Sequence, residues 1–302
     1  MWAFDTVNHG ILLKKLEKYG IRGVPLMWFT SYLTNRKQYV AIGDTVSPMR
    51  EIVCGIPQGS TLGPLLFLLY INDITNSSDI VSFRIFADDT NIFASSASAV
   101  ELQTILNQEL VKIKNWCNLN KLSINLTKTN FMVIKTSNKR LCSPLQINLL
   151  NNENIPNPLK QKDHIKYLGV MIDDQVSFKQ HISFVCSRLS RNTGIFLKLR
   201  HFLPLQQLKQ IYYSLIYPYI SYAIVAWGSA CKSHIQKLQA KQNHFFGASF
   251  LPLYMVNTLS QPALLFLNLL DIVTVDNAYR LQTLKFVHHW DKKQLPVIFN
   301  PY

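Results

Sequence analysis

Strand-like patterns stop near residue 173 of this 302-residue sequence, and this change constrains the fold more than any single motif does. Before it, short alternating segments at 37–43 and 47–57 surround a Gly-Asp turn, which predicts an antiparallel hairpin. After it, apolar residues recur at helical spacing. The sequence therefore predicts an α+β domain over residues 1–172 and a helical domain over residues 173–302. The long helical segments of the second part are 183–200, 204–216 and 234–246.

Helices are also expected in the first part, where they would cover the antiparallel sheet. Residues 11–20 and 24–33 have apolar residues at helical spacing, and Pro25 lies in the first turn of the second segment. Residues 65–74 are apolar on every side, which predicts a fully buried helix. The other expected elements are an amphipathic helix at 99–119, whose apolar stripe includes Val100, and strands at 131–134 and 167–172.

Two adjacent acids, Asp88 and Asp89, interrupt the apolar segment FADDTNIF at residues 86–93. Adjacent carboxylates repel each other and resist desolvation, so a half-buried pair needs a positive partner such as a divalent cation. The alternative is that both acids are solvated turn residues between two short strands, since aspartate is favoured in turns. A third interpretation, a phospho-acceptor site of the receiver type, lacks the βαβ repetition of such domains.

The positive charge is concentrated in the middle of the chain. The formal net charge is +14, yet residues 1–90 contain eight Lys and Arg against eight Asp and Glu. Residues 110–241 contain nineteen Lys and Arg against four Asp and Glu. Basic residues spaced among apolar and aromatic ones indicate a polyanion as partner, nucleic acid before a membrane surface. The alternative is a basic surface that serves solubility only.

Cysteine usage and hydropathy exclude several classes of protein. The five cysteines include no CxxC pair, which argues against a zinc site and against a disulfide framework. The N-terminal residues lack the pattern of a signal peptide. The longest uncharged run, residues 211–227, is short for a membrane span and contains Pro218, so it predicts a buried helix, with contact between its tyrosines and nucleic acid as the alternative. The cysteines are Cys54, Cys117, Cys142, Cys186 and Cys231.

The order of three motifs carries the functional signal. The strings AFDTVNH, GIPQGSTLGPLLFLLYINDI and FADDT follow one another within ninety residues. Together they resemble a reverse transcriptase, and more narrowly the polymerase of non-LTR (LINE-type, jockey-like) retrotransposons. The likeness continues through WCNLNKLSINLTKTNFMVI, YLGVMID, LRHFLP and YPYISYAIVAWG. It implies a polymerase palm with an antiparallel sheet and covering helices over residues 1–172, followed by a helical thumb and a C-terminal extension over 173–302.

The resemblance also implies the chemistry. Such enzymes join deoxynucleoside triphosphates to the 3′-hydroxyl of a DNA primer on an RNA template, using two Mg²⁺ ions. By likeness, Asp88 and Asp89 are the metal-binding and catalytic carboxylates, and Lys128 is a candidate proton donor to the leaving pyrophosphate. An intracellular location, in the nucleus or the cytoplasm, is implied as well, without a membrane.

Further positions of the motifs imply binding roles. Phe4 matches the steric-gate residue that excludes a ribose 2′-hydroxyl, and residues 167–169 match the primer grip. Three of the implied site residues also have a simpler structural interpretation. Phe4 can be an ordinary core residue, Gln58 can form a hydrogen bond within its loop, and Lys128 can be a solvated lysine. The implied nucleotide-binding residues are Phe4, Gln58, Gly59 and Ser60, and the primer grip is Tyr167, Leu168 and Gly169. The implied nucleic-acid-binding residues, expected along two helical segments, are Lys179, Arg188, Arg191, Lys198 and Arg200.

One departure from the family pattern concerns the first metal-binding acid of the DxxxAFD string. That acid would lie two positions before Met1, and Asp5 is the second acid, which supports the local turn. The basic fingers region of the family is not matched either. The expectation is therefore a truncated, catalytically incomplete copy of the polymerase. The alternative is a non-catalytic nucleic-acid-binding remnant.

Overall fold

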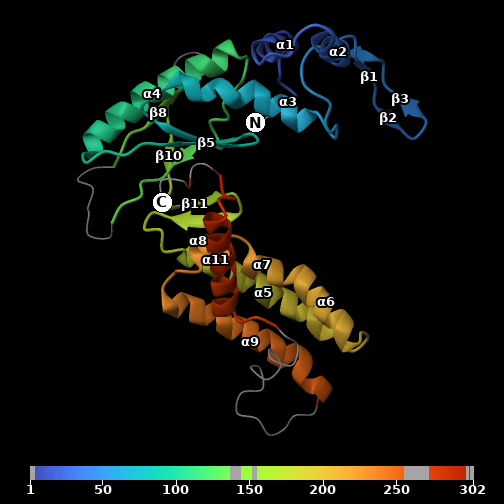
Figure 1. The fold of residues 1–302 in the computed structure, drawn as a ribbon, viewed down its shortest axis with the longest axis vertical. Helices are drawn as coiled ribbons and strands as arrows, with labels where there is room; N and C mark the ends of the chain where they lie inside the picture. Colours follow the sequence, from blue (N-terminus) through green and yellow to red (C-terminus); the bar gives the residue numbers. More distant parts are fainter. Residues whose placement is uncertain (1–3, 137–143, 152–154, 255–271, 297–298, 300–302) are drawn as a thin grey trace. The chain divides into compact units, whose positions relative to one another are not determined.

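The computed structural model describes residues 4–136, 144–151, 155–254, 272–296 and 299 (Figure 1). The chain forms two compact units, Met1–Phe131 with Arg140–Lys162 and Met132–Lys139 with Asp163–Tyr302. This division falls before the boundary expected at 172/173, because Val170 and Ile172 pack in the core of the second unit. Each unit has its own apolar core.

The helices of the first unit pack around a core that includes Leu12, Phe67 and Ile113. Asn8 begins the first helix, because its Oδ1 accepts a hydrogen bond from the Ile11 amide at 3.1 Å. The positions predicted for these helices are confirmed within a few residues at each end. They are α1 (His9–Lys18), α2 (Val24–Leu33), α3 (Gly63–Ile71), the 3-10 helix η1 (Asn72–Ser77) and α4 (Ala99–Leu119). However, α3 is not fully buried, because Leu65 and Leu68 are 52% and 45% exposed.

The strands of the first unit are short and pair only in twos among the described residues. The expected hairpin around the Gly-Asp turn is present but interrupted, because the Ser47 hydroxyl accepts the hydrogen bond of the Val40 amide. The strand expected at 131–134 is reduced to β7 (Asn130–Phe131), which pairs parallel with β10 (Lys160–Gln161). The antiparallel pairs are β1 (Lys37–Gln38) with β4 (Arg50–Glu51), β2 (Ala41–Ile42) with β3 (Thr45–Val46), β5 (Ser82–Phe86) with β6 (Asp89–Phe93), and β8 (Asn148–Leu150) with β9 (Pro156–Pro158).

The buried face of α4 differs from the predicted apolar stripe. Val100 is 74% exposed, so the stripe does not extend to the first turn of the helix. The buried face instead includes Glu109 and Lys114 beside Leu110 and Ile113. Glu109 accepts a hydrogen bond from Lys112 at 2.7 Å, which offsets part of the cost of burying its carboxylate.

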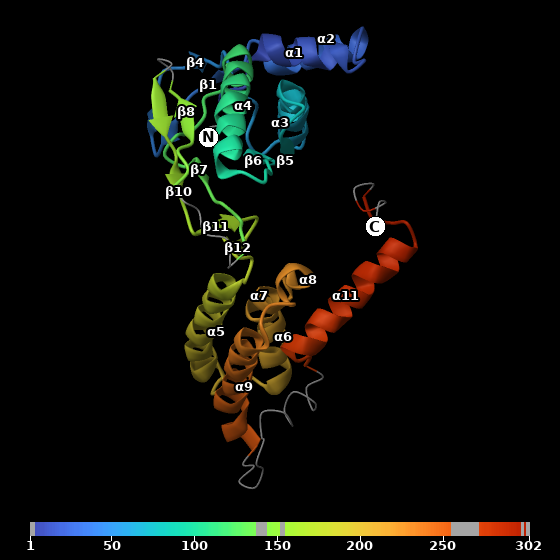
Figure 2. The same ribbon diagram turned by 90° about the vertical axis from the view of Figure 1, so that its left-hand side faces the viewer.

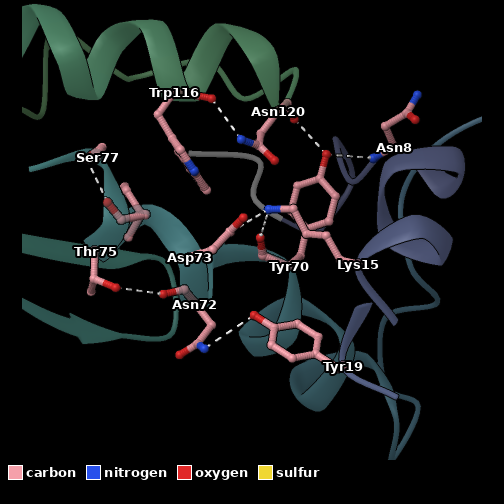
Figure 3. A network of polar contacts seen from close by, with 11 residues as sticks. Asn8, Lys15, Tyr19, Tyr70, Asn72, Asp73, Thr75, Ser77, Trp116 and Asn120 are labelled. Atoms are coloured by element: carbon pink, nitrogen blue, oxygen red, sulfur yellow. Dashed lines mark hydrogen bonds and ion pairs between the residues drawn. The ribbon is translucent and has the colours of Figure 1, made fainter. Parts of the chain in front are cut away.

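A buried lysine joins its own helix to three other elements of the first unit (Figure 3). The Lys15 ammonium donates hydrogen bonds to the Tyr70 carbonyl and to Asp73 Oδ1, both at 2.6 Å. It also lies 4.8 Å from the ring centroids of Tyr70 and Trp116. The Tyr70 hydroxyl donates to the Asn120 carbonyl at 2.6 Å. Burial lowers the pKa of Lys15, and its hydrogen bond to Asp73 opposes that shift. Lys15 therefore links α1 with α3, η1 and α4.

Replacing Lys15 with methionine is expected to destabilise the chain by about 1–3 kcal/mol, since the Tyr70 carbonyl and the Asp73 carboxylate lose a charged donor. Urea unfolding of the full chain measures this change. Lys14→Met is the matched control, because Lys14 is exposed on the same helix. Equal unfolding free energies for the two variants would show that the buried ammonium contributes nothing.

The second unit contains a hairpin and a group of helices in which α5 and α9 run side by side (Figure 2). Its core includes Leu189, Phe196, Tyr212, Trp227 and Phe245, all fully buried. The elements are β11 (His164–Tyr167), β12 (Val170–Asp173), α5 (Lys179–Leu199), α6 (Leu205–Leu215), α7 (Tyr217–Ser221), α8 (Ile224–Trp227), α9 (Lys232–Tyr254) and α11 (Val275–Asp291).

Two predictions for this unit are wrong in detail. The segment 167–172 is not one strand, because Leu168 and Gly169 form the turn between β11 and β12. The run 211–227 is not one helix, since Pro218 lies in the first turn of α7 and Ala223, at φ +51°, separates α7 from α8. Within the part of the chain that the structure describes, no helix combines the length and the apolarity needed to cross a membrane.

Candidate functional site

The two acids lie at the tip of the hairpin formed by β5 and β6. Phe86 pairs with Asp89, which leaves Ala87 and Asp88 as a two-residue turn. Both residues are exposed, so the acids are not half-buried: Asp88 lies in the turn and Asp89 is the first residue of β6, both in contact with solvent. Exposed oxygen ligands of this kind still suit Mg²⁺, which retains several waters when it binds proteins.

The backbone at the tip is strained. Ala87 has φ +49°, a left-handed conformation in which its Cβ crowds the backbone. The hairpin below the turn is well anchored, because Phe83, Ile85 and Ile92 pack against the core of the first unit. A rigid base therefore supports a strained tip that presents Asp88 and Asp89.

The segment around Phe4 is joined to the loop that follows Cys54. The Ile56 amide donates to the Phe4 carbonyl and the Gly55 amide to the Val7 carbonyl, both at 2.8 Å. Gly55 has φ +89°, and a Cβ there would lie 3.0 Å from the Asp5 backbone, so only glycine fits. His9 Nε2 lies 2.7 Å from the Gly55 carbonyl in a buried hydrogen bond. Sequence reasoning missed His9 and the close approach of Gly55.

The predicted nucleotide-binding residues lie along these two segments. The Phe4 ring is half-buried, with its centroid 5.1 Å from that of Phe67. The Gln58 side-chain amide donates to Asp5 Oδ1 at 2.7 Å, which ties the loop to the acid that was expected to support the turn. Gly59 is exposed at φ +78°, a conformation that favours glycine.

Ser60 and Lys128 have local backbone roles. The Ser60 hydroxyl donates to the Pro57 carbonyl at 2.7 Å and accepts from the Gly63 amide at 3.0 Å, at the beginning of α3. Lys128 is exposed in a turn closed by Asn125, whose Oδ1 accepts from the Lys128 amide at 3.1 Å. Its ammonium is open to solvent, in line with the solvated interpretation.

The predicted nucleic-acid-binding residues lie on one helix and its cap, not on two helical segments. Lys179, Arg188, Arg191 and Lys198 belong to α5, and Arg200 is its C-cap. Arg191 and Lys198 are exposed and seven residues apart, so they share one face of the helix. The Arg188 guanidinium lies 5.0 Å from the Phe184 ring centroid, which orients it along the surface.

The predicted primer grip is the turn of the β11–β12 hairpin. Tyr167 pairs with Val170, and Leu168 and Gly169 are the two turn residues, with φ of +43° and +88°. The Leu168 carbonyl accepts a hydrogen bond from the Tyr222 hydroxyl at 2.6 Å. From the sequence, nucleic-acid contact was an alternative for the tyrosines of 211–227, but a contact between Tyr222 and this turn was not predicted.

The remaining features of the site are its possible metal ligands and the state of the cysteines. No group of three or more His, Cys, Asp or Glu side chains that could hold a metal ion occurs within the described ranges. Asp88 and Asp89 supply carboxylate oxygens, the donor type that Mg²⁺ prefers. Cys142 lies outside the described residues, and the free cysteines are Cys54, Cys117, Cys186 and Cys231.

Comparison with known proteins is consistent with this arrangement. Residues 2–172 match the family model described as "Reverse transcriptase (RNA-dependent DNA polymerase)". The chain is 31% identical to the probable RNA-directed DNA polymerase from transposon X-element of Drosophila melanogaster, over 80% of this chain and 26% of that protein. It is 29% identical to the RNA-directed DNA polymerase from mobile element jockey of Drosophila funebris, over 80% of this chain and 26% of that protein.

A more distant similarity points the same way. The chain is 26% identical, over 62% of its length and 18% of the relative, to the Pol polyprotein from type-1 retrotransposable element R1 of Bradysia coprophila. The chain spans about a quarter of the length of the X-element and jockey polymerases. Since the family model matches more than half of the residues, the chain belongs to the reverse transcriptase (RNA-dependent DNA polymerase) family and is similar to its members from non-LTR retrotransposons.

Proposed function

We propose that this chain is the palm and thumb portion of a non-LTR retrotransposon polymerase, which extends a DNA primer on an RNA template with deoxynucleoside triphosphates. The observation that carries the proposal is the β5–β6 hairpin, which presents two exposed carboxylates at a strained turn above a packed base. It supports the proposal because phosphoryl transfer depends on acids held in fixed positions.

Asp88 and Asp89 are the residues that would hold Mg²⁺. When bound, the ion lowers the pKa of the primer 3′-hydroxyl and neutralises charge on the pyrophosphate. The other residues bind and orient the nucleotide. The Phe4 ring, fixed against Phe67, limits the space at the sugar, and the loop that contains Gln58 and Gly59 lines the nascent base pair. Lys128 offers an exposed ammonium to the leaving phosphates.

A chimera tests the proposal. In it, this chain replaces the matched segment of the X-element polymerase, so that the rest of a full-length relative surrounds it. The expected result is Mg²⁺-dependent incorporation of deoxynucleotides on an RNA template with a DNA primer. A chimera that binds template-primer but incorporates nothing would overturn the polymerase proposal and favour the non-catalytic, nucleic-acid-binding alternative. Assaying the 302-residue chain by itself tests the expectation of catalytic incompleteness.

The basic face of α5 supports nucleic-acid binding by the second unit. If about six basic residues contact phosphates, log K for the full chain is expected to fall with log salt with a slope near ~5 for duplex and ~4 for single strands. Replacing Arg191 and Lys198 together with glutamine should weaken binding and lower the slope by about 2. Fluorescence anisotropy at several salt concentrations measures both quantities.

Two variants serve as controls for the salt titration. Lys14→Gln removes an exposed positive charge from α1 and is expected to leave the slope unchanged, unlike the pair on α5. Asp88→Asn should also leave the affinity unchanged, because phosphate contacts supply the binding. Binding that does not depend on salt would reduce the basic face to a solvated surface.

A further inference from the structure

The turn between β11 and β12 has a sequence that poorly suits its conformation. Leu168 and Gly169 both have positive φ, as a two-residue type I′ turn requires. Asparagine or glycine is preferred at the first position, because a leucine Cβ crowds the backbone in the left-handed region. The turn therefore depends on contacts with other elements to hold its shape.

Tyr222 supplies those contacts. Its hydroxyl donates to the Leu168 carbonyl at 2.6 Å. Its ring packs over the second turn residue, since a Cβ on Gly169 would lie 3.1 Å from Tyr222 Cε1. Tyr222 is 54% exposed, so burial alone does not hold its side chain against the turn. The hydroxyl contact spans 54 positions in the sequence.

Trp227 fixes the backbone that presents Tyr222. The buried Trp227 indole donates to the Tyr222 carbonyl at 2.9 Å. The same indole packs against His181, with ring centroids 5.1 Å apart. His181 Nδ1 accepts from the Met171 amide of β12 at 3.4 Å, and burial lowers the pKa of His181 to about 4, so the ring is neutral at pH 7. The hairpin is thus held at its turn and along β12 by groups that meet at Trp227.

The support leaves one side of the turn available. Among the described residues, the backbone N–H groups of Leu168 and Gly169 have no hydrogen-bond partner, whereas the Leu168 carbonyl is occupied by Tyr222. Adjacent free N–H groups in a turn attract anions such as a phosphate oxygen. The turn can therefore bind a nucleic-acid backbone while its carbonyl side is fixed.

We infer that Tyr222 is a positioning residue, which fixes the Leu168–Gly169 turn, the primer grip implied by the family resemblance, in the conformation that contacts the primer strand. The inference rests on the proposed function of the chain. The segment between α7 and α8, which contains Tyr222, would then help to place the primer 3′ end in addition to connecting the two helices.

Tyr222→Phe in the full chain tests the first half of the inference, because it removes the hydroxyl and keeps the ring. Amide hydrogen exchange at Val170 and Met171, the first residues of β12 after the turn, is expected to accelerate by about tenfold. Tyr219→Phe is the matched control, since Tyr219 lies on α7, whose C-cap is Tyr222, and no hydrogen bond of its hydroxyl occurs among the described residues. Unchanged exchange in Tyr222→Phe would overturn the inference.

Placement of the primer end tests the second half. The full chain is expected to prefer a template-primer with a recessed 3′ end over a blunt duplex, and 2-aminopurine at the 3′ terminus reports its contact with the protein. Tyr222→Phe should reduce that preference by about fivefold while total affinity stays within twofold, because α5 supplies most of the affinity. A merely structural role would lower the melting temperature and leave the preference intact.

The outcomes separate the two proposals. A wild-type chain that binds no nucleic acid overturns the proposed function, and with it the role of the turn toward a primer. A wild-type chain that prefers the recessed end, together with a Tyr222→Phe variant that keeps the same preference and the same 2-aminopurine signal, overturns only the inference about Tyr222.

Discussion

Asp88→Asn in the X-element chimera is expected to lower deoxynucleotide incorporation by about a thousandfold. Metal ions contribute several kcal/mol of charge stabilisation in the transition state, and each 1.36 kcal/mol corresponds to a factor of ten in rate. The amide keeps the shape of the side chain but lacks the negative charge. Because Asp88 is exposed at the turn, the substitution should leave folding intact. Single-turnover extension of a labelled primer at saturating Mg²⁺ measures the effect.

The control for this experiment is Asp79→Asn, which removes another exposed acid from the first unit. Its rate should stay within twofold of the parent. Comparable losses in the two variants would indicate a general effect of charge, and a rate for Asp88→Asn above one third of the parent would contradict the metal-binding role.

Phe4→Val in the same chimera is expected to raise the relative incorporation of ribonucleotides by about one to two orders of magnitude. The ring is fixed by its contact with Phe67, so its removal opens space at the sugar that the neighbouring backbone cannot readily fill. Discrimination is the ratio of kcat/KM for a deoxynucleotide to kcat/KM for the matching ribonucleotide, and differences of 1–3 kcal/mol in a pocket give ratios of this size.

A matched control separates the steric gate from loss of packing. Phe29→Val makes the same change in a partly buried ring against the same core, on α2. It is expected to lower stability without changing the ratio. If both variants discriminate as the parent does, Phe4 is an ordinary core residue and the gate assignment is wrong.

Parts of the site were predictable from local sequence. The strand-like flanks of the Asp88-Asp89 pair predict a hairpin with both acids in its turn. The hairpin is present, but its turn consists of Ala87 and Asp88, and Asp89 begins β6. The level of burial was not predictable, since FADDTNIF contains enough apolar residues for either a half-buried or an exposed turn. Its register places the inward residues Phe83 and Ile85 on the core and leaves Phe86 exposed.

Other features depend on distant contacts that no local pattern encodes. Lys15 occupies a helical position typical of a solvated lysine, yet Asp73 and two aromatic rings reach it from other elements. The turn at Leu168 lacks the Asn-Gly signature of a type I′ hairpin, so local sequence does not predict it. Its stabilising contact comes from Tyr222, 54 positions away in the sequence. The sequence therefore predicts the motifs and most helices, but not the contacts that fix their conformation.

The close approach of Gly55 to Asp5 has a consequence for fidelity. Backbone hydrogen bonds on both sides of that approach join the segment of Phe4 to the loop of Gln58, and Gln58 itself bonds Asp5. In the proposed function, the segment of Phe4 contacts the sugar of the incoming nucleotide, and the loop of Gln58 contacts the nascent base pair. Because they form a single backbone assembly, selectivity for the sugar and accuracy of base pairing should rise or fall together when either segment is altered.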